Sequence, residues 1–285
     1  MPYESALSNL GGMVLNVIEP IRFGAGCLLT QPEVFPSRAD LLDNGSIGHV
    51  QLMVIPQPES DFQTNIQPFE SYKGKIRIHA PHHLQQVNPC EPDLFSSGIP
   101  DIRGHIEAAM SQTLEAADRT GSEIIVVHAG RYRHGHKEEA IASFHGFLDQ
   151  YPDPRYILES LPDLQFGPAY LGVTPEELKV LGVGTIRGYC PDFPHLWCTS
   201  KVRGLPYQDL LDGMADLGMK FSHLSGSPGP ESERQHLLFD DPDNRFSLGL
   251  IRSFLTDHRD LELILEFAVD DPAVIMRQVT IGSEC

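Results

Sequence analysis

The chain has 285 residues, of which 41% are hydrophobic and 21% are charged, and these proportions exclude a disordered or fibrous protein. Acidic residues outnumber basic ones by 39 to 21, which gives a formal net charge of −18. This balance argues against a general nucleic-acid binder, because such proteins usually carry a basic surface. It leaves room for a local basic groove or for bound divalent cations.

Short apolar runs rich in β-forming residues recur along the whole chain and predict strands. Helical patterns lie between several of them, and Thr174 followed by Pro175 has the form of a helix N-cap and first residue. The expected strands cover residues 21–27, 49–55, 75–79, 123–128, 155–159, 185–189, 220–224 and 261–266, and the expected helices cover 102–119, 137–150, 207–217, 246–256 and 272–278.

Strands that alternate with helices indicate a parallel sheet. Eight such units in a chain of this length predict an α/β fold, a single-domain (β/α)8 TIM barrel that spans residues 1–285. The beginning of the chain is less regular. Residues 1–20 are interpreted as an N-terminal extension, in which residues 13–18 are a candidate for an additional strand.

Six consecutive strand candidates deliver a histidine or an acidic residue at their C-terminal ends, which is the catalytic face of a TIM barrel. Any one of these could be a structural histidine or a helix cap, but six in succession are hard to attribute to packing. Three carboxylates in one barrel mouth need a cation to neutralise them. The six residues are His79, His128, Glu159, Asp192, His223 and Glu266.

Imidazoles and carboxylates together suit zinc best, with manganese or iron as alternatives. Six ligands exceed the three or four that one ion takes from a protein, so we expect two divalent ions, or three if the flanking candidates below form another site. Glu159 is the candidate bridge between two of them, and a water between two ions would become a nucleophile near neutral pH. Glu159 and Glu266 are the catalytic candidates.

Further candidates flank these six residues. His195, His236 and Glu233 could form another metal site, or the histidines could contact substrate or solvent. Arg131 and Arg133 belong to a cationic segment that could hold an anion or could simply be a solvated loop.

Trp197 could stack on a ring of the substrate, although a lone tryptophan more often packs in the core. The five cysteines contain no CxxC pair, which argues against a disulfide framework and a zinc–thiolate site and favours a reducing cytoplasm. The N-terminus has no signal-peptide pattern, and no apolar run reaches about 18 residues, so we expect no membrane association.

Between His79 and Glu266 the sequence resembles the endonuclease IV family of the xylose isomerase-like TIM-barrel superfamily. The resemblance is carried by six short pieces in the same order, each at a strand end. They are His79-Ala80-Pro81, His128-Ala129-Gly130, Leu158-Glu159-Ser160, the segment from Cys190 to His195, His223, and Leu265-Glu266.

The resemblance implies a trinuclear zinc site that cleaves DNA at abasic positions. It assigns His79, His128 and Glu159 to one ion. Glu159 would also serve a second ion, together with Asp192, His223 and Glu266. His195 and His236 would bind a third.

The sequence departs from the family at three places that affect the third ion and DNA contact. Arg234 stands where the family has an aspartate, and Glu233 is the candidate replacement. His82 stands where the family has an aromatic residue that enters the DNA, and is a candidate substrate contact. No lysine or arginine occurs between Arg38 and Lys73, where the family uses an arginine.

Two enzyme functions therefore remain open, with a non-catalytic, metal-storing barrel as a third interpretation. The first is a metal-dependent phosphoester hydrolase that resembles endonuclease IV, acting on a phosphorylated small molecule or on nucleic acid. The second is a sugar isomerase or epimerase of the same superfamily, built on the four ligands from Glu159 to Glu266. Such enzymes use a second acid soon after the first metal ligand, where this chain offers only Asp163.

Overall fold

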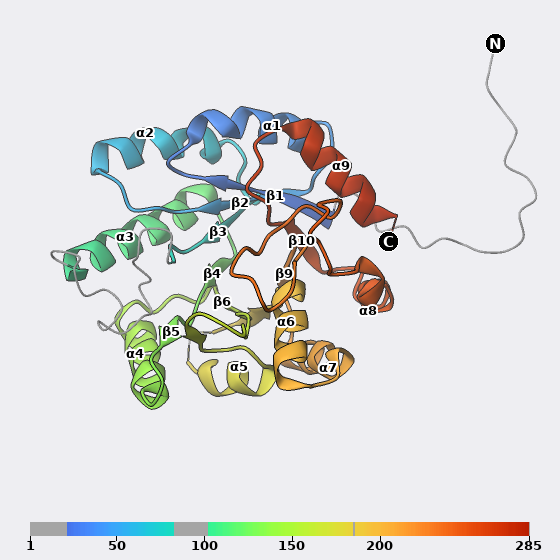
Figure 1. The fold of residues 1–285 in the computed structure, drawn as a ribbon. Helices are drawn as coiled ribbons and strands as arrows, with labels where there is room; N and C mark the ends of the chain where they lie inside the picture. The colour runs from blue at the N-terminus through green and yellow to red at the C-terminus, as the bar shows by residue number, and fades with distance from the viewer. Residues whose placement is uncertain (1–21, 83–101, 185, 285) are drawn as a thin grey trace, which may run out of the picture.

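A computed structural model describes residues 22–82, 102–184 and 186–284 of the chain, and the expected extra strand at 13–18 lies outside them. Eight parallel strands form one sheet, which curls into a nearly closed barrel (Figure 1). Single parallel bridges, Tyr189 to Met219 and Asp192 to His223, join its first and last strands. In sheet order the strands are β8 (Gly188–Cys190), β6 (Tyr156–Glu159), β4 (Ile125–Val127), β3 (Ile76–His79), β2 (His49–Met53), β1 (Phe23–Leu28), β10 (Glu262–Leu265) and β9 (Phe221–Leu224).

Helices surround the barrel on its outside (Figure 1), which confirms the predicted (β/α)8 architecture. Thr174 caps its helix as expected, because its side chain accepts a hydrogen bond from the backbone N–H of Glu177. The helices within the described residues are α1 (Phe35–Asp43), α2 (Glu59–Glu70), α3 (Ile102–Thr120), α4 (Lys137–Gln150), α5 (Pro175–Leu181), α6 (Phe193–Arg203), α7 (Tyr207–Leu217), α8 (Arg252–Asp257) and α9 (Pro272–Ser283).

Three helices, α1, α2 and α6, were not anticipated from the sequence pattern. In α6, every residue from Phe193 to Ser200 is buried, so no polar face marks the helical period. The buried stripe of α2 has helical spacing, but Pro68 interrupts the pattern. The expected helix at 246–256 is shorter than predicted: a 3-10 turn at Leu248–Leu250 precedes α8.

The interior of the barrel is filled by its own side chains below the carboxyl ends of the strands. Val126, Ile157, Cys190, Phe221 and Ile264 form one buried cluster, with each residue contributed by a different strand. A second and larger apolar core lies between the strands and the surrounding helices. The barrel is therefore a packed core rather than a pore, and the functional groups lie above this plug.

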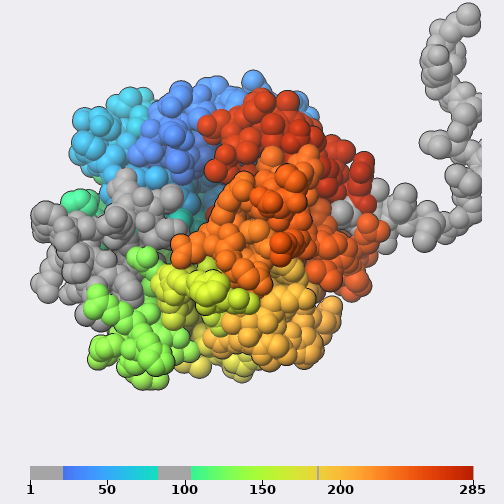
Figure 2. Space-filling view, in the orientation of Figure 1, coloured from blue at the N-terminus to red at the C-terminus, as the bar shows by residue number. Residues whose placement is uncertain are grey.

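Loops at the carboxyl ends of the strands pack against one another. Two short strands, β5 (Arg131–Tyr132) and β7 (Ala169–Tyr170), pair in antiparallel fashion. The loop between β6 and β7 lies beside the long segment after β9, where the backbone N–H of Gln165 donates to the carbonyl of Pro230, and Figure 2 shows these segments side by side. Among the described residues, no helix is both long enough and apolar enough to cross a membrane.

Candidate metal centre

The first group of potential ligands joins three neighbouring strands. His79 is the last residue of β3, His128 directly follows β4, and Glu159 is the last residue of β6. The Nε2 atoms of His79 and His128 lie 3.2 Å and 2.9 Å from Oε2 of Glu159. Both His79 and Glu159 are fully buried, so these groups meet in a site that water reaches poorly.

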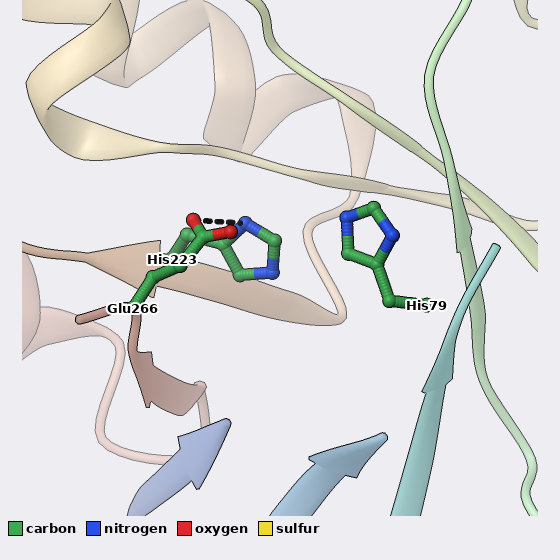
Figure 3. A group of neighbouring side chains, drawn as sticks. All are labelled: His79, His223 and Glu266. Carbon is green, nitrogen blue, oxygen red and sulfur yellow. Dashed lines mark ion pairs between the residues drawn. The ribbon is translucent and has the colours of Figure 1, made fainter. Parts of the chain in front are cut away.

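The second group lies on the other side of the same glutamate. His223 is part of β9 and Glu266 directly follows β10, and the His223 Nδ1 atom lies 3.2 Å from Oε2 of Glu266 (Figure 3). The same Nδ1 atom is 3.2 Å from Oε1 of Glu159. Asp192 completes the group, because one potential ligand atom from each of the four residues lies within 4.8 Å of the others.

Glu159 therefore connects the two groups through different oxygen atoms. Its Oε2 atom faces His79 and His128, whereas its Oε1 atom faces His223. His79 also lies close to the second group, because ligand atoms of His79, His223 and Glu266 lie within 4.8 Å of one another, and the centroids of the two imidazole rings are 5.7 Å apart (Figure 3). A carboxylate with ligand groups on both sides has the arrangement expected of a bridge between two cations.

A third group consists of Asp192, His195 and His236. Asp192 caps α6, because its Oδ1 atom accepts a hydrogen bond of 2.8 Å from the backbone N–H of His195. The third group thus takes its carboxylate from the second group. Arg234, at the position where the related family has an aspartate, instead forms ion pairs with Asp241 and Asp243.

His236 has a backbone φ of +61°, the left-handed region that residues other than glycine rarely adopt, and it is the one such residue in the described part of the chain. The neighbouring Gln235 holds the loop in place. Its amide donates to the carbonyls of Gly229 and Ser232 and accepts from the hydroxyl of Ser227. Backbone strain of this kind persists where the surroundings enforce it, often at functional sites.

The chemistry of the three groups fits a divalent cation. Buried polar atoms normally have hydrogen-bond partners, yet several buried atoms here have none even though they lie close together. They converge on shared space and face one another at ion-pair distances, such as 3.2 Å between Nδ1 of His223 and Oε2 of Glu266, as potential metal ligands do. The atoms are Asp192 Oδ2, His223 Nδ1, His236 Nδ1 and Glu266 Oε2.

The titration behaviour of the cluster points the same way. Burial opposes ionisation of Glu159, but His223 and His128 outweigh it and hold the pKa of this carboxyl well below its usual range. Burial, together with the charges of Glu266 and Glu159, raises the pKa of Asp192 well above its usual value. Without a cation these surroundings favour the protonated form of Asp192, whereas a bound cation would favour its ionised form.

Each of three ligand histidines has a contact on its second ring nitrogen. The Nδ1 atom of His79 lies 2.7 Å from the carbonyl oxygen of Ala80, and Nδ1 of His195 lies 3.1 Å from that of Ser160. His223 instead meets a side chain, Gln51 on β2. Gln51 is not among the residues predicted from the sequence. A polar residue within the mostly apolar run of its strand could have indicated it.

The remaining sequence-predicted residues lie in different places. His82 stacks on His128, with ring centroids 4.7 Å apart, and is therefore close to the first group. Arg131 lies on β5 and Arg133 in the exposed loop after it. Glu233 is exposed and belongs to no group of converging ligand atoms among the described residues, so the structure does not support it as a metal ligand.

The expectation that Trp197 could stack on a substrate is not supported by its position. Its ring is buried in the apolar core, where it packs edge-on against Phe246 beneath the ammonium group of Lys201. The surface pocket that it borders is lined by α6, α7 and the segment near Leu250, without any member of the metal groups. The indole packs in the core because it is a large apolar group within the part of α6 from Phe193 to Ser200, in which every residue is buried.

Comparison with solved structures supports the fold. Over 92–93% of the chain, similar structures include a D-tagatose 3-epimerase-like protein (17% identity, TM-score 0.59), a Thermus thermophilus protein soaked with zinc chloride (18%, 0.58) and endonuclease IV from the same organism (20%, 0.59). The match covers 98–99% of each of those chains. No protein-family model and no curated protein matches the sequence.

The sequence resemblance is thereby confirmed at the level of the fold. The structural neighbours are endonuclease IV and epimerase-like or xylose isomerase-like TIM-barrel proteins. Because identity with these three is 20% or less, the comparison establishes a shared architecture and leaves the reaction to be argued from the site.

Proposed function

We propose that this protein is a divalent-metal-dependent phosphoester hydrolase that holds at least two ions, with zinc as the favoured metal. The observation that carries the proposal is the position of Glu159 between two sets of ligands. A single-ion enzyme has no need of His79 and His128, because the second group already supplies four ligands. The first group would therefore bind a second ion.

Bound ions in such a pair activate water and stabilise the leaving oxygen of a phosphoester. The protein residues supply the geometry for this chemistry. Glu159 sets the spacing between the two ligand groups, and burial of His79 and Glu159 keeps bulk water away. Arg131 and Arg133, which follow β4 on the same side of the barrel, are the proposed contacts for the substrate phosphate.

The same arrangement supports two firmly held ions rather than three. Oδ1 of Asp192 already accepts the hydrogen bond that caps α6, so Oδ2 is its one oxygen without a hydrogen-bond partner and the favoured metal ligand. That single oxygen would have to serve both the second and the third group. We therefore propose that His195 and His236 hold a third ion weakly or contact the substrate directly.

A phosphorylated small molecule or a nucleic acid is the proposed substrate class. Endonuclease IV is among the structural neighbours, and another neighbour was soaked with zinc chloride, which supports both hydrolysis and zinc. The net charge of −18 and the absence of basic residues between Arg38 and Lys73 favour the small molecule over a DNA strand.

A sugar isomerase or epimerase is the second candidate, because a D-tagatose 3-epimerase-like protein shares the fold and the second group alone would suffice for it. The additional acid that such a reaction calls for is not well placed here. Asp163 is bound by Arg203 through a 2.7 Å contact, and its backbone N–H bonds to Thr199. Asp163 therefore serves the ion network at the ends of α5 and α6.

The number of bound ions and the effect of removing His128 distinguish the two candidates. Metal content per chain would be measured after zinc loading, together with hydrolysis of bis(4-nitrophenyl) phosphate and deuterium uptake from solvent by a panel of ketoses. The hydrolase proposal predicts two ions in the native protein. It also predicts that His128→Ala loses one ion and at least on the order of a hundredfold in hydrolysis rate.

His105→Ala, on the exposed surface of α3, serves as the matched histidine control and should retain both ions and the native rate. One ion per chain, with ketose exchange that survives the His128→Ala substitution, would instead establish the isomerase. Phosphodiesterase activity that persists after complete removal of metal would contradict both candidates.

A further inference from the structure

We propose that Gln51 is a positioning residue that sets the tautomer of His223 and thereby controls metal binding by the second group. Gln51 is the central residue of β2, a strand that supplies none of the predicted ligands. Its side chain is 4% exposed, and its amide nitrogen lies 2.9 Å from Nε2 of His223. The inference rests on the proposed metal centre and applies equally to a hydrolase and an isomerase.

The argument begins with the two nitrogen atoms of His223. Nδ1 faces Glu159 and Glu266 at 3.2 Å each, so this is the atom that a cation between those carboxylates would use. A neutral imidazole that offers the Nδ1 lone pair carries its proton on Nε2. His223 is fully buried, so that proton needs an acceptor within the protein.

Gln51 meets Nε2 with its amide nitrogen, which donates to the tautomer that carries its proton on Nδ1. A half turn of the amide presents either its N–H or its carbonyl oxygen to His223, so the same side chain serves both tautomers. When the carbonyl accepts the Nε2 proton, Nδ1 is free to bind a cation. Metal-bound histidines commonly depend on such a contact to hold the ring orientation and increase ligand basicity.

The other two contacts of this kind are made by the backbone. His79 and His195 face the carbonyl oxygens of Ala80 and Ser160. Of the three contacts, only that of His223 can be removed by changing one side chain without moving the strand. The position also explains why a glutamine is buried between Val50 and Leu52, because a buried amide is costly unless it is hydrogen-bonded.

Two substitutions separate the role of an acceptor from that of a donor or a space-filling group. Gln51→Met keeps an unbranched side chain of similar length and removes the hydrogen bond. Gln51→Glu keeps an acceptor oxygen and removes the N–H donor. Gln112→Met is the matched control, because Gln112 is equally buried but bonds to the backbone of Gln57, away from the metal groups.

The affinity for Zn²⁺ would be measured in competition with a chelator, and the Co²⁺-loaded proteins would be compared by their visible absorption spectra. Gln51→Met should weaken binding by about 10- to 100-fold and change the cobalt spectrum. Gln51→Glu should bind at least as tightly as the native protein. Gln112→Met should leave both the affinity and the spectrum unchanged.

Native affinity in Gln51→Met would overturn the inference, as would a Gln51→Glu variant as weak as Gln51→Met. If circular dichroism shows that Gln51→Met does not fold, Gln51→Glu alone decides, because a donor role predicts loss of binding there. Equal affinities overturn only the role of Gln51. A native protein that binds no ion overturns the proposed function as well.

Discussion

Charged side chains at the two ends of the barrel differ in how completely they are paired within the protein. At the N-terminal end, Arg77 forms two hydrogen bonds of 2.6 Å and 2.7 Å with the carboxylate of Glu262. Arg155 is held by Asp153 and Asp118 at comparable distances. At the C-terminal end, Oδ2 of Asp192 and Oε2 of Glu266 have no hydrogen-bond partner and face only histidine nitrogens, at 3.2–3.5 Å.

This difference separates groups that stabilise the fold from groups that await a ligand. Charges that satisfy one another within the protein need nothing further. Several carboxylates gathered in one buried mouth destabilise the folded protein until a cation joins them. The contrast agrees with the general division of labour in TIM barrels, where the N-terminal end supports stability and the C-terminal end carries the chemistry.

The largest expected effect comes from Glu159→Gln, because this residue joins the two ligand groups. We expect the variant to lose ions from both groups and on the order of a thousandfold in phosphodiesterase rate, equivalent to about 4 kcal/mol of transition-state stabilisation. Elemental analysis of the purified variant and single-turnover kinetics would measure both. Retention of two ions would remove Glu159 from its central role.

Metal removal should affect stability through the C-terminal end alone. A cation at a hundredfold excess over its Kd stabilises a folded protein by about 2.7 kcal/mol. Urea unfolding of the native protein should therefore shift to a clearly lower midpoint when a chelator replaces zinc. Equal midpoints in zinc and in chelator would mean that the converging carboxylates do not form a metal centre.

The buried His49, at the start of β2, should make stability depend on pH at the N-terminal end. Burial lowers the pKa of His49 from 6.5 to about 4. Between about pH 4 and pH 6.5, His49 is therefore protonated in the unfolded chain and neutral in the folded protein. The free energy of unfolding is therefore highest above pH 6.5, and it falls by up to about 3 kcal/mol as the pH decreases towards 4.

His49→Leu should flatten this dependence without changing metal content. Urea unfolding of the variant and of the native protein, both in chelator at about pH 8 and about pH 5, would isolate the contribution of this histidine. An unchanged difference in unfolding free energy between the two pH values would show that His49 is not the group that titrates.

The smallest expected effect is that of Arg77→Met, which leaves the half-buried Glu262 without its partner. We expect a loss of about 1–3 kcal/mol in the free energy of unfolding. The loss should be the same in zinc and in chelator, because contributions from distant sites add. A loss that depends on zinc would show that the two ends are coupled.

The eight main strands and the placement of their terminal ligands could be predicted from the sequence. The residues directly before His79, Glu159 and Glu266 are apolar, so each polar residue marks the strand end. The helix α6 escaped prediction because burial on all sides removes the amphipathic signal. A hydrophobic periodicity predicts a helix only where one face of the helix is apolar and the other is polar. A helix that is buried on both faces gives no such periodicity.

The sequence by itself thus determined which residues stand at the catalytic end of the barrel, since strand periodicity and chain order are local properties. Only the tertiary structure decided how those residues group. Asp192 joins His195 and His236, Glu159 turns one oxygen to each side, and Gln51 reaches His223 across 172 positions of the chain. Such contacts depend on barrel closure and side-chain direction, which no short stretch of sequence encodes.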